Sequence, residues 1–275
     1  MKQAAIRLVA IDVDGTLLDS SHRLQKPVGQ ALDELNARGV NVVLATARSP
    51  QALLIVLGEL TFAPLLVCFS GAWIGEMTLQ SLTPRPALWE KRHTASSARL
   101  IVETAFAHDV EPNVFGPETW RVRRLTKEIL AESQITDTRP VITSEVLWEG
   151  EEPNKILLIT SEGYAAARLD TIAQKVRSVS TATFSKPNYL EIIPFGVNKA
   201  KALANLTRMR GLELSQVAAL GDGLNDLEMV REAAIGIAMG NASDEVKFAA
   251  DWVTGTNDEA GVAQAVRKLI SEGMV

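Results

Sequence analysis

Two acidic residues directly follow an apolar run near the start of the chain, in "VAIDVDGTLLDS" (residues 9–20), where Asp12 and Asp14 are one residue apart. Carboxylates at the end of a buried strand repel each other and are costly to desolvate unless a cation lies between them. A hairpin turn explains one acid but not both, and neither register of a calcium loop fits the residues that follow. The pair therefore predicts a divalent metal site, and a ligand set made only of oxygen favours Mg²⁺.

A second acidic cluster, "GDGLNDLE", spans residues 221–228. One interpretation is a capping box, in which Asn225 caps a helix, Glu228 completes the box and Asp226 suits the first turn. That interpretation leaves Asp222 unexplained. Because Asp222 lies between two glycines after an apolar run, the backbone there can approach a ligand closely. We therefore expect Asp222 to share a crevice with the first acidic pair and to bind the same metal.

Two further residues predict an anion site. Thr46 precedes a segment in which Ser49 is expected to cap a helix and Pro50 to open it, and a helix N-terminus attracts phosphate. Lys199 falls in the first turn of a helix expected to start near Asn198, where a cation opposes the helix dipole by roughly 0.3–1 kcal/mol. A nearby anion would offset that cost. A solvated lysine is the alternative interpretation of Lys199.

The elements that must position these residues are short, continuous apolar runs separated by amphipathic stretches of helical period. This pattern is typical of a parallel sheet with helices on both faces. Polar residues follow the carboxyl end of each run, which is the edge where open α/β sheets bind ligands. We predict an α/β fold with a doubly wound, mostly parallel sheet. The expected strands are residues 6–11, 40–45, 64–69, 216–220 and 234–238.

The middle of the chain has a different character. Residues 83–187 mix strand-like pieces such as "KILLITSEG" with helical ones such as "ARLIVETAFAHD", and they hold three of the five tryptophans. We therefore predict that an α+β cap, residues 83–187, is inserted between two halves of a core domain, residues 1–82 and 188–275.

Charge and composition exclude several classes of function. The net charge is −5 and the basic residues are scattered, so we expect neither nucleic acid nor an anionic membrane as a partner. Apolar segments fall short of a membrane span, and the N-terminus lacks the features of a signal peptide, so the cytoplasm is the expected location. The one cysteine, Cys68, lies in "PLLVCF" and is expected to be a buried, inert thiol.

Taken in order, these segments resemble the four motifs of the haloacid dehalogenase superfamily of phosphatases. Residues 184–203, the closing residues 237–266 and the large insertion are similar to the Cof-type branch. The motif residues are Asp12, Asp14, Gly15 and Thr16, then Thr46, then Lys199, then Gly221, Asp222, Asn225 and Asp226. The chain departs from the branch pattern at Ala47, Ser70 and Ala200, where Gly, Asn and Gly are usual; these departures concern local backbone shape and substrate orientation, not the chemistry.

The resemblance implies a Rossmann-like core and a phosphatase that hydrolyses a phosphate monoester. Asp12 would attack phosphorus to form an aspartyl-phosphate. Asp14 would protonate the leaving alcohol and then activate the water that releases phosphate. Mg²⁺ would be held by Asp12, the backbone carbonyl of Asp14, and Asp222, and would remove the repulsion between carboxylate and phosphate.

The same resemblance assigns the remaining motif residues. Thr46, Lys199 and Asn225 would bind the phosphoryl oxygens, with Arg48 and Asp226 in support. The expected substrate is a small phosphorylated metabolite, a sugar phosphate or a similar monoester, whose leaving group the cap would recognise. The expected assembly is a monomer or a weak homodimer.

Two other functions remain open at this stage. A phosphomutase of the same superfamily would use the same nucleophile but return the phosphoryl group to a sugar. A phospho-aspartate receiver or binding protein would hold phosphate without hydrolysis, although the chain length, the insertion and Asp14 oppose that interpretation. Arg121, Arg123 and Arg124 form a basic cluster that either contacts an anionic substrate or is solvated at the surface.

Overall fold

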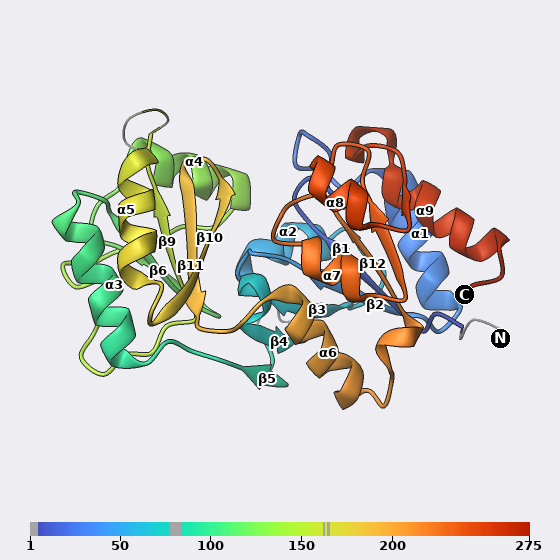
Figure 1. Ribbon diagram of the computed structural model, residues 1–275, viewed down its shortest axis with the longest axis horizontal. Helices are drawn as coiled ribbons and strands as arrows, with labels where there is room; N and C mark the ends of the chain where they lie inside the picture. Colours follow the sequence, from blue (N-terminus) through green and yellow to red (C-terminus); the bar gives the residue numbers. More distant parts are fainter. Residues whose placement is uncertain (1–4, 78–83, 162, 164–165) are drawn as a thin grey trace.

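The computed structural model describes residues 5–77, 84–161, 163 and 166–275. Two sheets form two units that lie side by side (Figure 1). One unit is built from both ends of the chain and the other from its middle, as the sequence predicts for a core with an inserted cap. None of the described helices is both long and apolar enough to cross a membrane.

The core sheet has eight strands in the order β14-β13-β12-β1-β2-β3-β4-β5. Neighbours from β14 to β3 are parallel, and β4 and β5 join antiparallel. The predicted doubly wound, mostly parallel sheet is therefore confirmed, and its five predicted strands begin one or two residues later than expected. The strands are β1 (Leu8–Asp12), β2 (Asn41–Ala45), β3 (Leu65–Cys68), β4 (Trp73–Gly75), β5 (Trp89–Glu90), β12 (Val217–Gly221), β13 (Ile235–Ala238) and β14 (Trp252–Val253).

Helices cover both faces of this sheet, because successive strand residues point to opposite sides. Val9 and Ile11 of β1 join one hydrophobic cluster with α1 and α9, whereas Leu8 and Ala10 join another with α6 and α7. Both faces are buried, which explains the unbroken apolar runs. The helices are α1 (Lys26–Ala37), α2 (Leu54–Leu57), α6 (Lys199–Met209), α7 (Leu227–Glu232), α8 (Asp244–Ala249) and α9 (Gly261–Ser271).

The cap holds a six-stranded sheet in the order β10-β11-β9-β6-β7-β8. Helices α3 and α5 pack on its outer face, and its other face is turned to the core (Figure 1). The elements of the cap are α3 (Ala95–Ala107), β6 (Pro112–Gly116), β7 (Thr119–Val122), α4 (Lys127–Thr136), β8 (Val141–Ile142), β9 (Lys155–Ile159), α5 (Ala166–Val176), β10 (Ser180–Lys186) and β11 (Tyr189–Pro194).

The domain boundaries need correction. The predicted boundary between residues 82 and 83 lies outside the described residues, but β5 at residues 89–90 still pairs with β4 in the core sheet. The predicted boundary at residue 187 is too early. Strand β11 pairs with β9 and β10 and so belongs to the cap sheet as far as Pro194.

Apolar packing joins the cap to the core. The rings of Phe69 from the core and Phe115 from the cap lie 6.4 Å apart, and Trp120 stacks on Phe115 at 5.2 Å. All three belong to the same buried cluster as Cys68. Burial also raises the pKa of the Cys68 thiol, which agrees with an inert cysteine.

Two predicted helix starts have different outcomes. Helix α6 begins at Lys199, and the side chain of Asn198 accepts from the backbone N–H of Lys201 at 2.8 Å, as expected of a cap. The start at Ser49 and Pro50 is wrong in detail. The chain first forms a short 3₁₀ turn at residues 51–53 and only then α2, although Ser49 Oγ still accepts from Ala52 N at 3.3 Å.

We expect position 71 to tolerate no side chain, because the backbone of Gly71 has φ +104° and an added Cβ would lie 2.4 Å from the carbonyl oxygen of Asn198. Gly39→Ala is the matched control: its φ is +75°, but nothing lies within 4 Å of an added Cβ. We expect Gly39→Ala to lower the free energy of unfolding by about 1–2 kcal/mol. Gly71→Ala should lower it by about 1–3 kcal/mol more. Urea unfolding measures both, and equal losses would contradict the close packing of Gly71 against the start of α6.

Candidate active site

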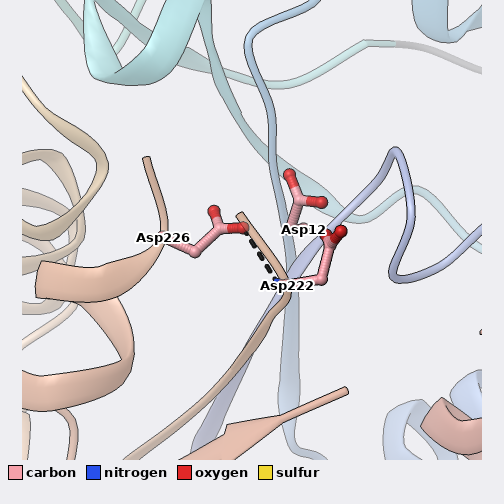
Figure 2. A group of neighbouring side chains, drawn as sticks. All are labelled: Asp12, Asp222 and Asp226. Carbon is pink, nitrogen blue, oxygen red and sulfur yellow. Dashed lines mark hydrogen bonds between the residues drawn. The ribbon is translucent and has the colours of Figure 1, made fainter. Parts of the chain in front are cut away.

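Three carboxylates meet at the carboxyl edge of the core sheet. Asp12 ends β1, and Asp222 directly follows β12, the parallel neighbour of β1. Asp226 lies one turn further along, immediately before α7. Figure 2 shows the three side chains converging, and one oxygen from each lies within 4.8 Å of the others. The strand order β12-β1-β2 explains this meeting, since the chain leaves β1 on one side and returns on the other.

Lys199 is buried among these carboxylates. Its Nζ donates to Asp12 Oδ1 at 2.5 Å and to Asp226 Oδ1 at 2.6 Å, and its side chain is fully shielded from solvent. Desolvation disfavours the charged ammonium, but the two carboxylates outweigh it and raise the pKa of Lys199. The solvated interpretation of Lys199 is therefore wrong.

The cluster still carries more negative than positive charge. Burial, reinforced by the charge of Asp226, raises the pKa of Asp12 well above its ordinary value, although Lys199 opposes the shift. Burial and Asp226 likewise raise the pKa of Asp222 to about 6. Carboxylates with raised pKa values at one point are the signature of a site that a cation would stabilise.

The oxygens of Asp226 are already engaged. Its Oδ2 accepts from the backbone N–H groups of Asp222 and Gly223 at 3.2 and 3.1 Å, and its Oδ1 binds Lys199. The capping box predicted at Asn225 and Glu228 as an alternative is wrong, because α7 begins only at Leu227. Asp226 thus shapes the loop, and Asp12 and Asp222 are left as the carboxylates that could hold a metal.

Two neighbours orient Asp222. The hydroxyl of Thr16 donates to Asp222 Oδ1 at 2.9 Å, and Asn241 Nδ2 lies 3.5 Å from Oδ2 while donating to the carbonyl of Gly15 at 2.8 Å. Neither Thr16 nor Asn241 was predicted to have a role. The available signal was that each lies in the short polar stretch that follows a predicted strand. A rigid, oxygen-rich donor set of this kind fits a hard divalent cation.

Asp14 lies beyond the strand end with 42% of its side chain exposed. Arg48 grips it with two hydrogen bonds, from Nε to Oδ2 at 2.8 Å and from Nη2 to Oδ1 at 2.6 Å, and His22 Nδ1 approaches Oδ1 at 3.6 Å. Desolvation raises the pKa of Asp14, but the contacts with His22 and Arg48 outweigh it and lower the pKa below its ordinary value. Asp14 is therefore ionised in this arrangement.

A cavity of about 360 Å³ opens in front of these residues, and cap side chains line its far side. Thr46 and Asn225 line it as well, so all the predicted phosphate-binding residues lie close to Asp12. Thr46 Oγ1 accepts from the backbone N–H of Arg48 at 3.0 Å. The helix N-terminus that Thr46 was expected to face is replaced by the 3₁₀ turn at residues 51–53. The core residues that line the cavity include Asp12, Asp14, His22, Thr46, Arg48, Asp222 and Asn225.

The cap adds a buried lysine that the sequence analysis missed. Lys155, the first residue of β9, lines the cavity and donates from Nζ to the carbonyl of Ala47 in the core at 2.8 Å. It also pairs with Glu191 at 2.9 Å, with both side chains less than a tenth exposed. Glu132 lines the same wall, and burial raises its pKa. A lysine opening an otherwise apolar strand was the signal in the sequence.

The arginine cluster lies elsewhere in the cap. Arg121 is buried, pairs with Glu151 and stacks on the ring of Trp148 at 4.2 Å. Arg123 and Arg124 both face Glu111, at 3.8 and 3.3 Å. None of the three lines the described cavity. Their contacts stabilise the cap. Arg121 is buried, so the interpretation of a solvated surface residue is wrong for Arg121.

Comparison with known proteins now identifies the fold and its chemistry. Residues 9–266 match the family of haloacid dehalogenase-like hydrolases. The chain belongs to this family. A curated relative, 5-amino-6-(5-phospho-D-ribitylamino)uracil phosphatase YcsE of Bacillus subtilis, is 29% identical over 275 residues, which cover 96% of either chain. Other relatives are named as phosphatases, including one of Haemophilus influenzae that is 29% identical over 97% of this chain and 99% of its own length.

Solved structures agree. A haloacid dehalogenase-like hydrolase from Bacteroides thetaiotaomicron aligns with a TM-score of 0.85 at 26% identity, over 96% of this chain and 99% of its own. A subclass IIB sugar phosphatase of the superfamily aligns with a TM-score of 0.80 at 22% identity, over 98% of this chain and all of its own. At this identity the match shows only that the two folds are alike. The Cof-type fold and the phosphatase class predicted from the motifs are confirmed.

Lys155 generates a prediction about stability. Lys155→Met removes one partner of a buried ion pair, so Glu191 is left charged and unpaired and the carbonyl of Ala47 loses its donor. We expect the free energy of unfolding to fall by about 3–5 kcal/mol. Urea unfolding of the purified variant gives this value.

The control is the double variant Lys155→Met/Glu191→Met, in which neither charge is buried. It should recover most of the loss, because replacing both partners with apolar side chains removes the desolvation penalty. A double variant no more stable than the single one would show that the lysine matters through some contact other than Glu191.

Proposed function

We propose that this protein is a Mg²⁺-dependent phosphatase that hydrolyses a small phosphorylated metabolite, a sugar phosphate or similar monoester, through an aspartyl-phosphate. The observation that carries the proposal is the setting of Asp12. Its carboxylate is buried, faces a cavity, lies 2.5 Å from the Lys199 ammonium and shares that cavity with Asp14. A nucleophile, a cation and a second carboxylate thus lie around one point.

Asp12 attacks phosphorus and the alcohol departs, so one difficult displacement becomes two easier ones. Lys199 holds the Asp12 carboxylate in place and offsets negative charge as the phosphate approaches. Thr46 and Asn225 donate hydrogen bonds to the phosphoryl oxygens. Asp226 has an indirect role: its hydrogen bonds hold Lys199 and the backbone N–H of Asp222 in place.

Asp14 acts first as the general acid and then as the general base. Arg48 and His22 hold it ionised in the described arrangement, which suits the base that activates water in the second step. A phosphate dianion nearby disfavours a second negative charge and raises the pKa of Asp14, so a proton can be carried for the leaving alcohol. Arg48 holds the carboxyl group of Asp14 in position both when it is ionised and when it is protonated.

The metal would be held by Asp12, Asp222 and the backbone carbonyl of Asp14. Bound there, Mg²⁺ would supply Lewis-acid stabilisation of phosphoryl charge. The raised pKa values of Asp12 and Asp222 support this assignment, because they arise from burial together with the nearby charge of Asp226, and a bound cation would offset both.

The substrate class draws support from a relative. The B. subtilis protein is named for a substrate whose phosphate is carried by a ribityl group, which is a sugar alcohol. The cap wall of this cavity is rich in groups that hydrogen-bond hydroxyls, including Glu132, Lys155, Ser185 and Glu191. Such a wall suits a polyhydroxylated leaving group.

The role of Asp14 can be tested by varying the leaving group. Sugar alcohols need a proton as they leave, whereas nitrophenolate hardly does. Asp14→Asn should therefore slow phosphoryl transfer from a sugar phosphate by roughly 10²–10⁴-fold, with a much smaller loss for nitrophenyl phosphate. Rapid mixing with nitrophenyl phosphate should show a burst followed by slow turnover, because water attack is no longer assisted.

Asp12→Asn is the matched control and should show no burst with either substrate. If Asp14→Asn slowed transfer equally for both leaving groups while Mg²⁺ still bound, Asp14 would serve only to shape the metal site. A burst from Asp12→Asn would remove the nucleophile assignment and with it the aspartyl-phosphate.

Metal affinity should depend on pH. With the pKa of Asp222 at about 6, protons compete with Mg²⁺ below that value. We expect Mg²⁺ affinity by calorimetry to fall about tenfold between pH 7 and pH 5. Asp222→Ala should abolish most of the affinity at pH 7. Asp19→Asn, which removes a carboxylate at the rim of the same cavity, is the control that should bind as the wild type does.

A flat affinity profile from pH 5 to pH 7, or wild-type affinity in Asp222→Ala, would contradict the assignment of Asp222 as a ligand.

A further inference from the structure

Helix α4 of the cap turns one face toward the active-site cavity. Glu132, Ile135 and Thr136 line the cavity, and their spacing of three and four residues places them on the same side of the helix. Ile129, one turn earlier on that side, is buried in the cluster that joins the cap to the core. Helix α4 therefore presents the Glu132 carboxylate to the same cavity that Asp12 lines.

Glu132 differs from the other acidic residues that line this cavity. Each of the others has an ionic or hydrogen-bonding partner within the protein. The pairs are Asp12 with Lys199, Asp14 with Arg48, Asp19 with the backbone N–H groups of Ser21 and Arg23, Asp222 with Thr16, and Glu191 with Lys155. Among the residues that the structure describes, Glu132 forms no ion pair, and the proposed mechanism gives it no task.

Two cap lysines lie near Glu132, and neither pairs with it. Lys155 Nζ is held by Glu191 at 2.9 Å, and both of these side chains are less than a tenth exposed. Lys186 is exposed, and its Nζ lies over the ring of Tyr189, 4.7 Å from the ring centroid. The Glu132 carboxylate thus lines the cavity without a cation of the protein at pairing distance.

The charges around Glu132 favour a cationic ligand. Burial raises the pKa of Glu132, and Glu191 and Asp14 add to the shift, although Lys155 and Lys186 oppose it. An opposite charge brought by a ligand would stabilise the carboxylate in this setting. A charge-assisted hydrogen bond is about twice as strong as one between neutral groups, so an ammonium should bind better here than a hydroxyl. A second negative charge on the ligand would be repelled.

We propose that the leaving group of the substrate carries an aliphatic amine, as in the phosphate monoester of an amino sugar or amino alcohol, and that Glu132 binds its ammonium group. The phosphate lies at Asp12, and the hydroxyls of the leaving group contact the cap wall at Ser185 and Glu191. This inference rests on the proposed phosphatase function and names the substrate class of the same site.

Two sets of matched esters test the proposal. O-phosphoethanolamine, 2-hydroxyethyl phosphate and 2-phosphoglycolate share a two-carbon frame that ends in an ammonium, a hydroxyl or a carboxylate. Glucosamine 6-phosphate, glucose 6-phosphate and N-acetylglucosamine 6-phosphate carry an ammonium, a hydroxyl or a neutral amide at the same carbon. In at least one set, kcat/KM of the wild-type enzyme should be about tenfold or more higher for the ammonium ester than for the hydroxyl ester.

Esters that are poorly hydrolysed are measured as competitive inhibitors of nitrophenyl phosphate hydrolysis, and the ratio of inhibition constants is then compared. Equal values for the ammonium and hydroxyl esters in both sets would overturn the proposal. A preference for the hydroxyl, amide or carboxylate ester in both sets would overturn it as well.

Glu132→Gln keeps the size of the side chain and removes its charge, so the ratio of ammonium to hydroxyl ester should fall close to one. The effect of the amine on the leaving alcohol is the same for both enzymes, so the change in this ratio reports the contact itself. Glu128→Gln is the matched control. It makes the same change one turn earlier in α4, at a residue that does not line the cavity, and should keep the wild-type ratio.

A wild-type ratio in Glu132→Gln, or an equal loss for all three esters of a set, would show that Glu132 does not recognise the amine. An equal shift of the ratio in Glu128→Gln would indicate a long-range effect of charge in place of a contact. Lys186→Met tests the other possible partner of Glu132 and should keep or raise the ratio. If the preference for amines appeared only in Lys186→Met, Lys186 would occupy Glu132 in the wild-type enzyme and the proposal would be wrong.

Failure of the proposed function gives a different result. If nitrophenyl phosphate releases no phosphate in an Asp12-dependent reaction, the phosphatase mechanism fails and the role of Glu132 with it. If nitrophenyl phosphate is hydrolysed but neither set shows a preference for the amine, the mechanism stands and the role of Glu132 alone is wrong.

Discussion

Lys199 Nζ lies 2.5 Å from Asp12 and 2.6 Å from Asp226, and all three side chains are shielded from solvent. Burying such charges is costly unless each has a partner, so the helix, strand and loop that carry these side chains must hold them in contact. Helix α6 must begin where its first residue, Lys199, reaches Asp12 at the end of β1. The loop after β12 must fold back so that Asp226 meets the same ammonium. One positive charge for three carboxylates then leaves the site suited to a further cation.

The sheet topology makes that geometry possible. Strand β1 lies between β2 and β12, so loops from both halves of the chain converge at its carboxyl end. The insertion leaves the core after β5 and returns after β11, which suspends the cap over the same edge. The clustered carboxylates thus come from the core, and the far wall of the cavity comes from the cap.

Sequence reasoning predicted the features that depend on local pattern. Continuous apolar runs predicted five core strands, and the polar residues after them predicted that Asp12 and Asp222 meet. Lys199 was predicted from its place in the first turn of a helix, where a cation needs an anion nearby. It failed where the partner is distant in sequence. Nothing local to Arg48 indicates that it hydrogen-bonds to Asp14, and nothing local to β11 indicates that it pairs with β9 in the cap sheet. The helix expected after Ser49 was misjudged because the chain first makes a 3₁₀ turn.

The three departures from the branch pattern lie where the backbone, or helix propensity, governs the structure. Ala47 contacts the cap through its carbonyl, which accepts from Lys155, so its side chain does not decide the contact. Ser70 adopts φ +52°, a conformation that Asn tolerates better, yet its N–H still bonds the carbonyl of Thr46 at 2.9 Å. Ala200 follows Lys199 in α6, where alanine favours a helix by about 0.8–1 kcal/mol over glycine. Ala200 therefore stabilises the first turn of α6, which places Lys199 beside Asp12.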